Sequence, residues 1–298
     1  MQENRADKGG AGAMGKKLRK WINGVLIAVF AVSMTLTVYH WIQSKQAEQS
    51  YSEARQLAGL TKDSAASAVP TQPAAPTQPT EEPGPVGTEA QPYWIPAPVD
   101  DDPVLRELAV TDLGALRDVN PDVVGWIYSP GVEINYPIVQ GEDNLFYLEH
   151  SWEKEENVSG SIFLESTNSP DLKDFRSILY GHNMRDGSMF GSLNIYLYKP
   201  NWEKDPYIYL ITDEGVLRYE IYACYKAGVE SDTYQLVRDD AASREKLIAL
   251  TLELSELDTG IVPQVTDRIL TLSTCVGNAE YRLVVHARLP MIEVQPEG

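Results

Sequence analysis

The stretch that decides the fold is RILTLSTC, from Arg268 to Cys275, followed after five residues by YRLVVHARL, from Tyr281 to Leu289. Aliphatic and β-branched residues dominate both runs, which predicts strands over 268–273 and 282–289. With a period of two, one face of the first strand carries Thr271, Ser273 and Cys275, and the other face is more apolar. Strand ends often present reactive groups, so Cys275 is either a nucleophile or a small buried hydrophobe.

Similar short runs occur throughout the segment upstream of this pair. They predict strands over residues 124–128, 133–139, 161–164, 176–180, 207–212 and 216–225, and Asp213 to Gly215 reads as a hairpin turn. Two helices are expected. One runs from Pro103 to Val119, and the other carries an apolar stripe formed by Leu247, Leu250, Leu254 and Leu257. The number and close spacing of the strands predict a mainly β fold, a closed or nearly closed β-barrel with peripheral helices.

Charge and cysteine content exclude several classes of protein. The chain has 298 residues and a formal net charge of −18, but residues 1–45 hold seven basic and two acidic side chains, so the remainder carries about −23. A body this acidic lacks the basic surface that nucleic acids require. Two cysteines, Cys224 and Cys275, are too few for a disulfide scaffold and lack the spacing of a zinc site. Cys224 lies in the middle of a strand-like run, so packing is its expected role.

The N-terminal region predicts a membrane anchor. No charged residue occurs from Trp21 to Ser44, a stretch that spans roughly 36 Å as a helix and can cross a hydrocarbon core of about 30 Å. Six basic residues precede it, so the N-terminus is expected in the cytoplasm and the rest of the chain outside. A cleaved signal peptide is the alternative, but its apolar region is normally shorter, and the segment from Ser44 to Ala47 is a poor cleavage site.

A proline-rich segment follows the anchor. Ten of the 19 prolines lie between Pro70 and Pro103, a composition that favours an extended spacer over a packed domain, with a proline-rich ligand for a partner as the alternative. The expected organisation is a cytoplasmic basic tail, a transmembrane anchor, an extracellular stalk, a folded domain and a short tail, over residues 1–20, 21–44, 45–103, 104–292 and 293–298.

Two other residues have the chemistry to assist a cysteine nucleophile. His182 ends an apolar run and enters a turn, so it is the best placed of the four histidines to act as a base. Arg282 opens the strand that follows Cys275, and an antiparallel pairing of the two strands brings it beside the cysteine. Arg288 lies about 20 Å further along that strand and is too distant. A surface role remains the alternative for Arg282.

These motifs resemble the sortases, the cysteine transpeptidases of Gram-positive bacterial surfaces. TLSTC, from Thr271 to Cys275, resembles the sortase TLxTC signature, and the strand from Tyr281 to Leu289 resembles the arginine strand after it. YGHNMRDGSMF, from Tyr180 to Phe190, resembles the histidine segment of class B. The upstream stretches VVGWI, INYPIVQ and GSIFLE also resemble class B, so the similarity covers about residues 110–290. The loop between Cys275 and Arg282 is shorter than the family pattern.

The resemblance implies a sortase-type eight-stranded β-barrel and a set of roles. Cys275 becomes the nucleophile, His182 the general acid and base, and Arg282 the stabiliser of the oxyanion. Thr274 and Ser273 become supporting residues near the nucleophile. The implied reaction cleaves a C-terminal sorting motif of secreted surface proteins through a thioacyl enzyme, and it requires no metal or cofactor.

The acyl acceptor stays open between two amines. It is either an amine of the cell-wall peptide, which anchors a surface protein, or a lysine amine of a pilin subunit, as in a pilin polymerase. A non-catalytic anchored β-domain, acting as an adhesin or sensor, is the alternative from another class.

Overall fold

The computed structural model describes residues 10–60, 93–99, 101–197, 202–234, 240–275 and 280–295. The chain forms two compact units, Met1–Glu48 and Gln49–Gly298. The first holds most of helix α1 (Gly10–Leu57). Among the described residues, one helix is long and apolar enough to cross a membrane, and it is α1. Most of the expected stalk, residues 61–92, lies outside the described residues.

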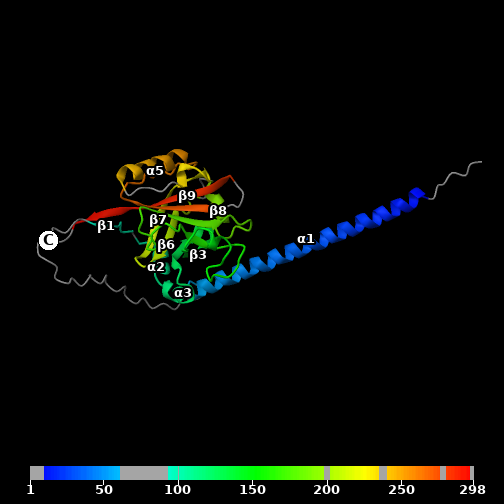
Figure 1. The fold of residues 1–298 in the computed structure, drawn as a ribbon. Coiled ribbons are helices and arrows are strands. Elements are labelled where there is room, and N and C mark those ends of the chain that lie inside the picture. Colours follow the sequence, from blue (N-terminus) through cyan, green and yellow to red (C-terminus); the bar gives the residue numbers. More distant parts are fainter. Residues whose placement is uncertain are drawn as a thin grey trace, which may run out of the picture. The chain divides into compact units, whose positions relative to one another are not determined.

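The second unit is built on a closed barrel of eight strands, as the sequence predicts (Figure 1). The strands follow one another around the barrel in the order β2-β3-β4-β5-β8-β9-β7-β6. The pairs β3–β4 and β5–β8 are parallel and the other pairs are antiparallel. Their bounds are β2 (Val123–Ser129), β3 (Ile134–Val139), β4 (Ile162–Leu164), β5 (Arg176–His182), β6 (Tyr207–Thr212), β7 (Gly215–Gly228), β8 (Arg268–Cys275) and β9 (Tyr281–Leu289).

The expected helix from Pro103 to Val119 is in fact two helices, α2 (Pro103–Leu108) and α3 (Leu113–Val119). Between them, the Thr111 hydroxyl donates to the Leu108 carbonyl at 2.7 Å, and the Asp112 carboxylate accepts from the Ala115 amide at 3.0 Å. These side chains end the first helix and cap the second. The prediction of one continuous helix was therefore wrong, whereas its end before Pro121 is confirmed.

Helix α5 (Ala241–Leu254) lies along one side of the barrel and packs against β7 (Figure 1). Its buried face consists of Leu247, Ile248 and Thr251, whereas Leu254 is exposed. The helix ends at Leu254 because Ser255 is extended and its hydroxyl accepts from the amides of Cys224 and Leu257. The predicted leucine stripe is therefore only partly the buried face.

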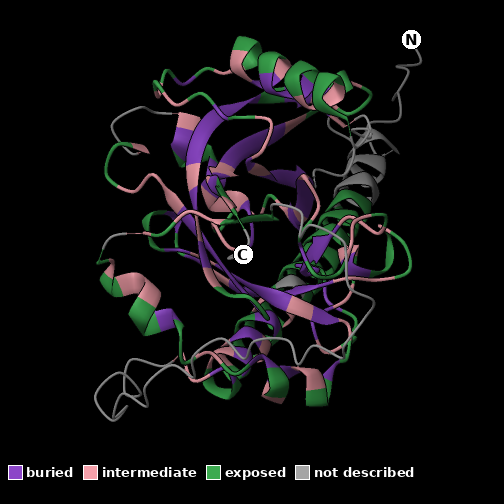
Figure 2. Cartoon of the chain, turned by 90° about the vertical axis from the view of Figure 1, so that its left-hand side faces the viewer, coloured by how far each residue is buried: buried purple, intermediate pink, exposed green. Residues whose placement is uncertain are grey.

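A two-stranded ribbon lies outside the barrel. Strand β1 (Tyr93–Pro96) pairs antiparallel with β10 (Met291–Val294). The short 3-10 helices η2 (Pro130–Val132), η3 (Phe146–Leu148), η4 (Gly191–Leu197) and η5 (Asp232–Tyr234) connect the strands. Figure 2 shows that burial concentrates in the barrel strands, while the outer faces of the helices are exposed.

Candidate active site

Two predicted site residues end neighbouring parallel strands. Strands β5 and β8 run in register, with Ile178 opposite Thr271 and His182 opposite Cys275. Both strands end here, so the backbone of the predicted nucleophile lies directly beside that of the predicted base. The close pairing follows from the parallel register and could not be read from two segments so distant in sequence.

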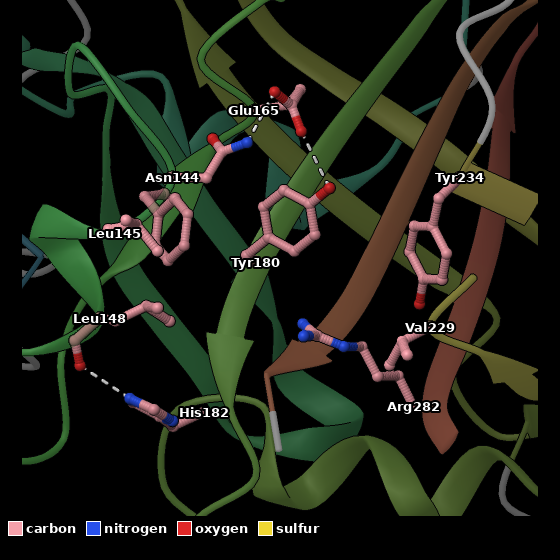
Figure 3. A pocket seen from close by; sticks show the side chains of 10 residues that line it. Asn144, Leu145, Leu148, Glu165, Tyr180, His182, Val229, Tyr234 and Arg282 are labelled. Carbon is pink, nitrogen blue, oxygen red and sulfur yellow. Dashed lines mark hydrogen bonds between the residues drawn. The ribbon is translucent and has the colours of Figure 1, made fainter. Parts of the chain in front are cut away.

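The imidazole of His182 is fixed by a backbone acceptor. Its Nε2 lies 2.7 Å from the carbonyl oxygen of Leu148 in η3 (Figure 3). A carbonyl only accepts, so Nε2 carries a proton, and the neutral ring then has its lone pair on Nδ1. This hydrogen bond fixes both the orientation and the tautomer of the ring.

Arg282 begins the partner strand of β8 and points into the same cavity as His182 (Figure 3). Strands β8 and β9 are antiparallel, with Ser273 opposite Val284, as expected. The Nε of Arg282 is buried and has no hydrogen-bond partner among the described residues. A buried donor without an acceptor is rare in folded proteins. The Arg282 side chain lines the cavity, where a guanidinium is suited to bind a ligand oxygen.

The cavity has a volume of about 470 Å³, which is within the range of ligand-binding pockets. Its walls combine apolar and polar side chains from the barrel and its loops. They are Asn144, Leu145, Leu148, Phe163, Glu165, Tyr180, His182, Val229, Tyr234 and Arg282.

A hydrogen-bonded group stands at the end of the cavity away from His182 (Figure 3). Glu165 accepts from the Asn144 amide at 2.7 Å and from the Tyr180 hydroxyl at 2.9 Å. Burial opposes ionisation of this carboxyl, but the hydrogen bonds from Asn144, Tyr180 and Thr167 outweigh it and lower the pKa of Glu165. The carboxylate is therefore charged at neutral pH and holds both neighbours in place.

The sequence did not identify Asn144, Glu165 or Tyr234 as site residues. Glu165 directly follows the run GSIFL, so a charged residue at a strand end was the available signal. Tyr234 carried no comparable signal, because it lies in a loop that reaches the cavity only through the fold.

The two predicted supporting residues have different surroundings. The Ser273 hydroxyl is 2.9 Å from the hydroxyl of Tyr234, which lines the cavity. The Thr274 hydroxyl instead accepts from the Leu283 backbone amide at 3.0 Å and is fully buried. Ser273 is thus linked to the cavity through a neighbour, whereas Thr274 joins β8 to β9.

Cys224 has the surroundings expected of a packing residue. Its side chain is fully buried in β7, and burial raises the pKa of the Cys224 thiol to about 12. Within the described part of the chain, no group of three or more His, Cys, Asp or Glu side chains could hold a metal ion.

Comparison with known proteins gives the family. Residues 127–290 match the sortase domain family. Sortase B of Listeria monocytogenes is 33% identical over 183 residues, which are 60% of this chain and 74% of the relative.

Solved structures agree. The Staphylococcus aureus sortase B–substrate complex has a TM-score of 0.56 and 32% identity, covering 61% of this chain and 84% of that one. Clostridium perfringens sortase B gives the same TM-score and identity and is covered completely. In this chain, as described above, the strand that ends at His182 pairs with the strand that ends at Cys275. The chain therefore belongs to the sortase family of cysteine transpeptidases and is similar to its class B members.

Proposed function

We propose that this sortase cleaves the C-terminal sorting motif of secreted proteins through a thioacyl intermediate on Cys275 and transfers the acyl group to an amine of the cell-wall peptide. The observation that carries the proposal is the in-register pairing of His182 with Cys275 at the edge of a cavity that is lined by both His182 and Arg282. The S. aureus relative solved as a substrate complex supports a peptide substrate.

In the first half-reaction, Nδ1 of His182 takes the proton of the Cys275 thiol, and the resulting thiolate attacks the carbonyl carbon that precedes the scissile bond, typically that of threonine. The C–S bond forms as the carbonyl π electrons move to oxygen. Arg282 donates hydrogen bonds to this oxyanion. Because Nε2 of His182 is committed to Leu148, the proton for the leaving amine comes from Nδ1. The C–N bond then breaks and leaves the thioacyl enzyme.

In the second half-reaction, an amine attacks the thioacyl carbon. Nδ1 of His182 accepts the proton of the incoming amine, the C–S bond breaks, and the Cys275 thiolate is restored. The new amide bond retains the acyl group that hydrolysis would release as an acid. Ser273 and Thr274 support the nucleophile strand, Ser273 through Tyr234 and Thr274 through β9.

The decisive experiment traps the intermediate. The purified protein is mixed with a peptide that carries a threonine-containing sorting motif, and the mass of the intact protein is measured without an added amine. An adduct confined to Cys275, absent in Cys275→Ala, is expected. Full cleavage and transpeptidation by Cys275→Ala would refute the proposal.

The identity of the acceptor is tested in the same reaction. Supplying a cell-wall peptide amine and a pilin lysine peptide in competition, and sequencing the product by mass spectrometry, shows which amine is used. A cell-wall product supports the proposal, and a pilin product shows the alternative, a class B-like polymerase.

The proposed location is the outer face of the cell membrane, with residues 21–44 in the lipid, the N-terminus in the cytoplasm and the catalytic domain over residues 104–292. Six basic residues before the apolar stretch support this orientation. Protease added to intact protoplasts should digest the catalytic domain and spare an N-terminal tag, whereas digestion of the tag alone would show the reverse orientation.

A further inference from the structure

A row of polar side chains crosses four adjacent strands of the barrel. The strands β5, β8, β9 and β7 are consecutive neighbours, and they contribute Arg176, Thr271, His286 and Tyr225 in that order. Thr271 and His286 are direct cross-strand partners. All four side chains are buried, so the row is an internal feature of the domain that the proposed reaction does not use.

Hydrogen bonds connect each member of the row to the next. Nε of Arg176 donates to the Thr271 hydroxyl at 3.2 Å, and that hydroxyl is 3.0 Å from Nδ1 of His286. Nε2 of His286 is 3.1 Å from the Tyr225 hydroxyl, and the two rings stack at 5.3 Å. The row therefore links β5, which ends at His182, to β8, which ends at Cys275, and continues across β9 to β7.

The row closes on itself through the connection after β7. The Tyr225 hydroxyl is 3.1 Å from the Thr233 hydroxyl in η5, and Nη2 of Arg176 donates to the Thr233 carbonyl. Thr233 is fully buried. One guanidinium thus joins the cysteine strand, through Thr271, to the loop that follows β7.

The residue after Thr233 is Tyr234, which forms part of the cavity wall opposite Tyr180 (Figure 3). The Tyr234 hydroxyl contacts Ser273, two residues before Cys275. Two consecutive loop residues are therefore attached to β8, one through Arg176 and one through Ser273. The attachment of Thr233 is a hydrogen bond to a buried charge, the Arg176 guanidinium.

A buried guanidinium holds its acceptors firmly. Burying an Arg side chain costs much free energy unless its N–H groups find acceptors. Opening the Thr233 contact would separate a buried donor from its buried carbonyl acceptor, which is unfavourable for the same reason. The planar fork of Arg reaches two acceptors in different directions, which the single ammonium of Lys does not reproduce.

We propose that Arg176 is a positioning residue that fixes the loop after β7 to the cysteine strand and so keeps Tyr234 in the wall of the substrate cavity. The inference rests on the proposed function of that cavity as the peptide site. Tyr234 lies in the wall of the proposed peptide site, so we expect its displacement to weaken the binding of substrate and transition state alike. The effect is then expected in KM and not in kcat.

The test compares Arg176→Met and Arg176→Lys with a matched control, Arg288→Met. Arg288 is a half-buried barrel arginine, less buried than Arg176, bonded to Glu220 at 2.9 and 3.0 Å and to Asp267 at 3.3 Å, and it lies outside the cavity. The measurements on each variant are Tm, kcat and KM for a sorting-signal peptide, and the rate of chymotrypsin cleavage after Tyr234 in the folded protein.

Arg176→Met is expected to raise KM about tenfold with kcat within about threefold and to speed cleavage after Tyr234. Arg176→Lys is expected to recover only part of both effects. Arg288→Met is expected to lower Tm while leaving KM and Tyr234 cleavage unchanged. The proposal would be overturned if Arg176→Met and Arg288→Met lost the same Tm and showed equal changes in KM and in cleavage after Tyr234. A fall in kcat at constant KM in Arg176→Met would also overturn it.

Two further measurements keep the outcome unambiguous. If Arg176→Met does not fold, Arg176→Lys, which keeps the charge but lacks the planar fork, is expected to change KM and cleavage in the same direction; no change in either overturns the proposal. If the unmodified protein does not cleave sorting peptides, the proposed function fails. The chymotrypsin measurement then decides the role of Arg176 by itself.

Discussion

Nε2 of His182 donates a 2.7 Å hydrogen bond to the carbonyl oxygen of Leu148, a backbone group that no side-chain substitution at Leu148 removes. The position of that carbonyl depends on Gly160. Gly160 has a φ of +56°, and a Cβ there would lie 2.5 Å from the Leu148 oxygen and 2.7 Å from the Tyr147 oxygen. Because Gly160 has no Cβ, the Leu148 carbonyl can lie where it accepts from Nε2 of His182, and this hydrogen bond sets the tautomer of the proposed general acid.

Gly160→Ala is expected to move the Leu148 carbonyl and release the His182 ring. Peptide cleavage should show kcat reduced about tenfold or more, since a misplaced acid or base loses most of its contribution. The free energy of unfolding should fall by about 1–3 kcal/mol. Gly260→Ala is the control, because Gly260 also has a positive φ, +71°, but nothing lies within 4 Å of its added Cβ. If kcat falls equally in both variants, backbone strain alone is responsible.

Substituting Arg282 should affect the chemical step. Arg282→Met is expected to lower kcat roughly 10²-fold, the usual cost of removing an oxyanion donor, and Arg282→Lys should restore little because Lys lacks the planar fork. Stopped-flow or chromatographic assays of peptide cleavage measure both. Arg117→Lys, which changes an exposed pair with Asp213, should leave kcat unchanged. Unaltered kcat in Arg282→Met would exclude the proposed role.

The two cysteines should differ sharply in reactivity. With a pKa of about 12, Cys224 holds roughly one thiolate in 10⁴ thiols at about pH 8, and it is also shielded from reagents. An alkylating probe should therefore label the folded protein once, at Cys275, and label the denatured protein twice. Peptide mapping identifies the site. Labelling of folded Cys275→Ala would contradict the assignment.

His286 should make the stability of the domain depend on pH. Burial, with the nearby charge of Arg176, lowers the pKa of His286 well below its ordinary value. The unfolded chain binds a proton near a pKa of about 6.5 and the folded chain does not, so stability is complete above that pH and falls as the pH decreases. The expected slope approaches about 1.4 kcal/mol per pH unit.

The measurement is chemical unfolding of the unmodified protein and of His286→Gln over a pH series through this range. Other titrating groups are common to both proteins, so the difference between the two slopes isolates His286. Equal slopes would show that His286 takes up its proton equally well in the folded state. The groups that face it are Arg176 from β5, Thr271 from β8, and Tyr222 and Tyr225 from β7.

Much of the fold could be predicted from residue patterns. All eight barrel strands coincide with predicted runs, because aliphatic and aromatic residues dominate these runs and are buried in the barrel. The errors lie where side chains cap the backbone. Asp112 starts a new helix inside a run that otherwise reads as one. The extended Ser255 ends α5 before Leu257, which is buried beyond the end of the helix.

The site was predictable only in part, for a different reason. His182, Cys275 and Arg282 have distinctive chemistry and stand at strand ends, so each could be chosen by its own surroundings. Asn144 and Tyr234 acquire significance only through partners, Glu165 and Ser273, that the closed barrel brings to them. Pairings between strands distant in sequence carry no local signal.

The parallel pairing of β5 with β8 also makes formation of the candidate site depend on most of the barrel. Parallel neighbours cannot be joined by a tight turn, and here β6, β7 and α5 are threaded between the two strands along the chain. The proposed acid and nucleophile therefore meet only through a long-range contact, a kind that forms slowly during folding. The backbones of His182 and Cys275 therefore come together only once the chain has folded through β8 and that strand has paired with β5.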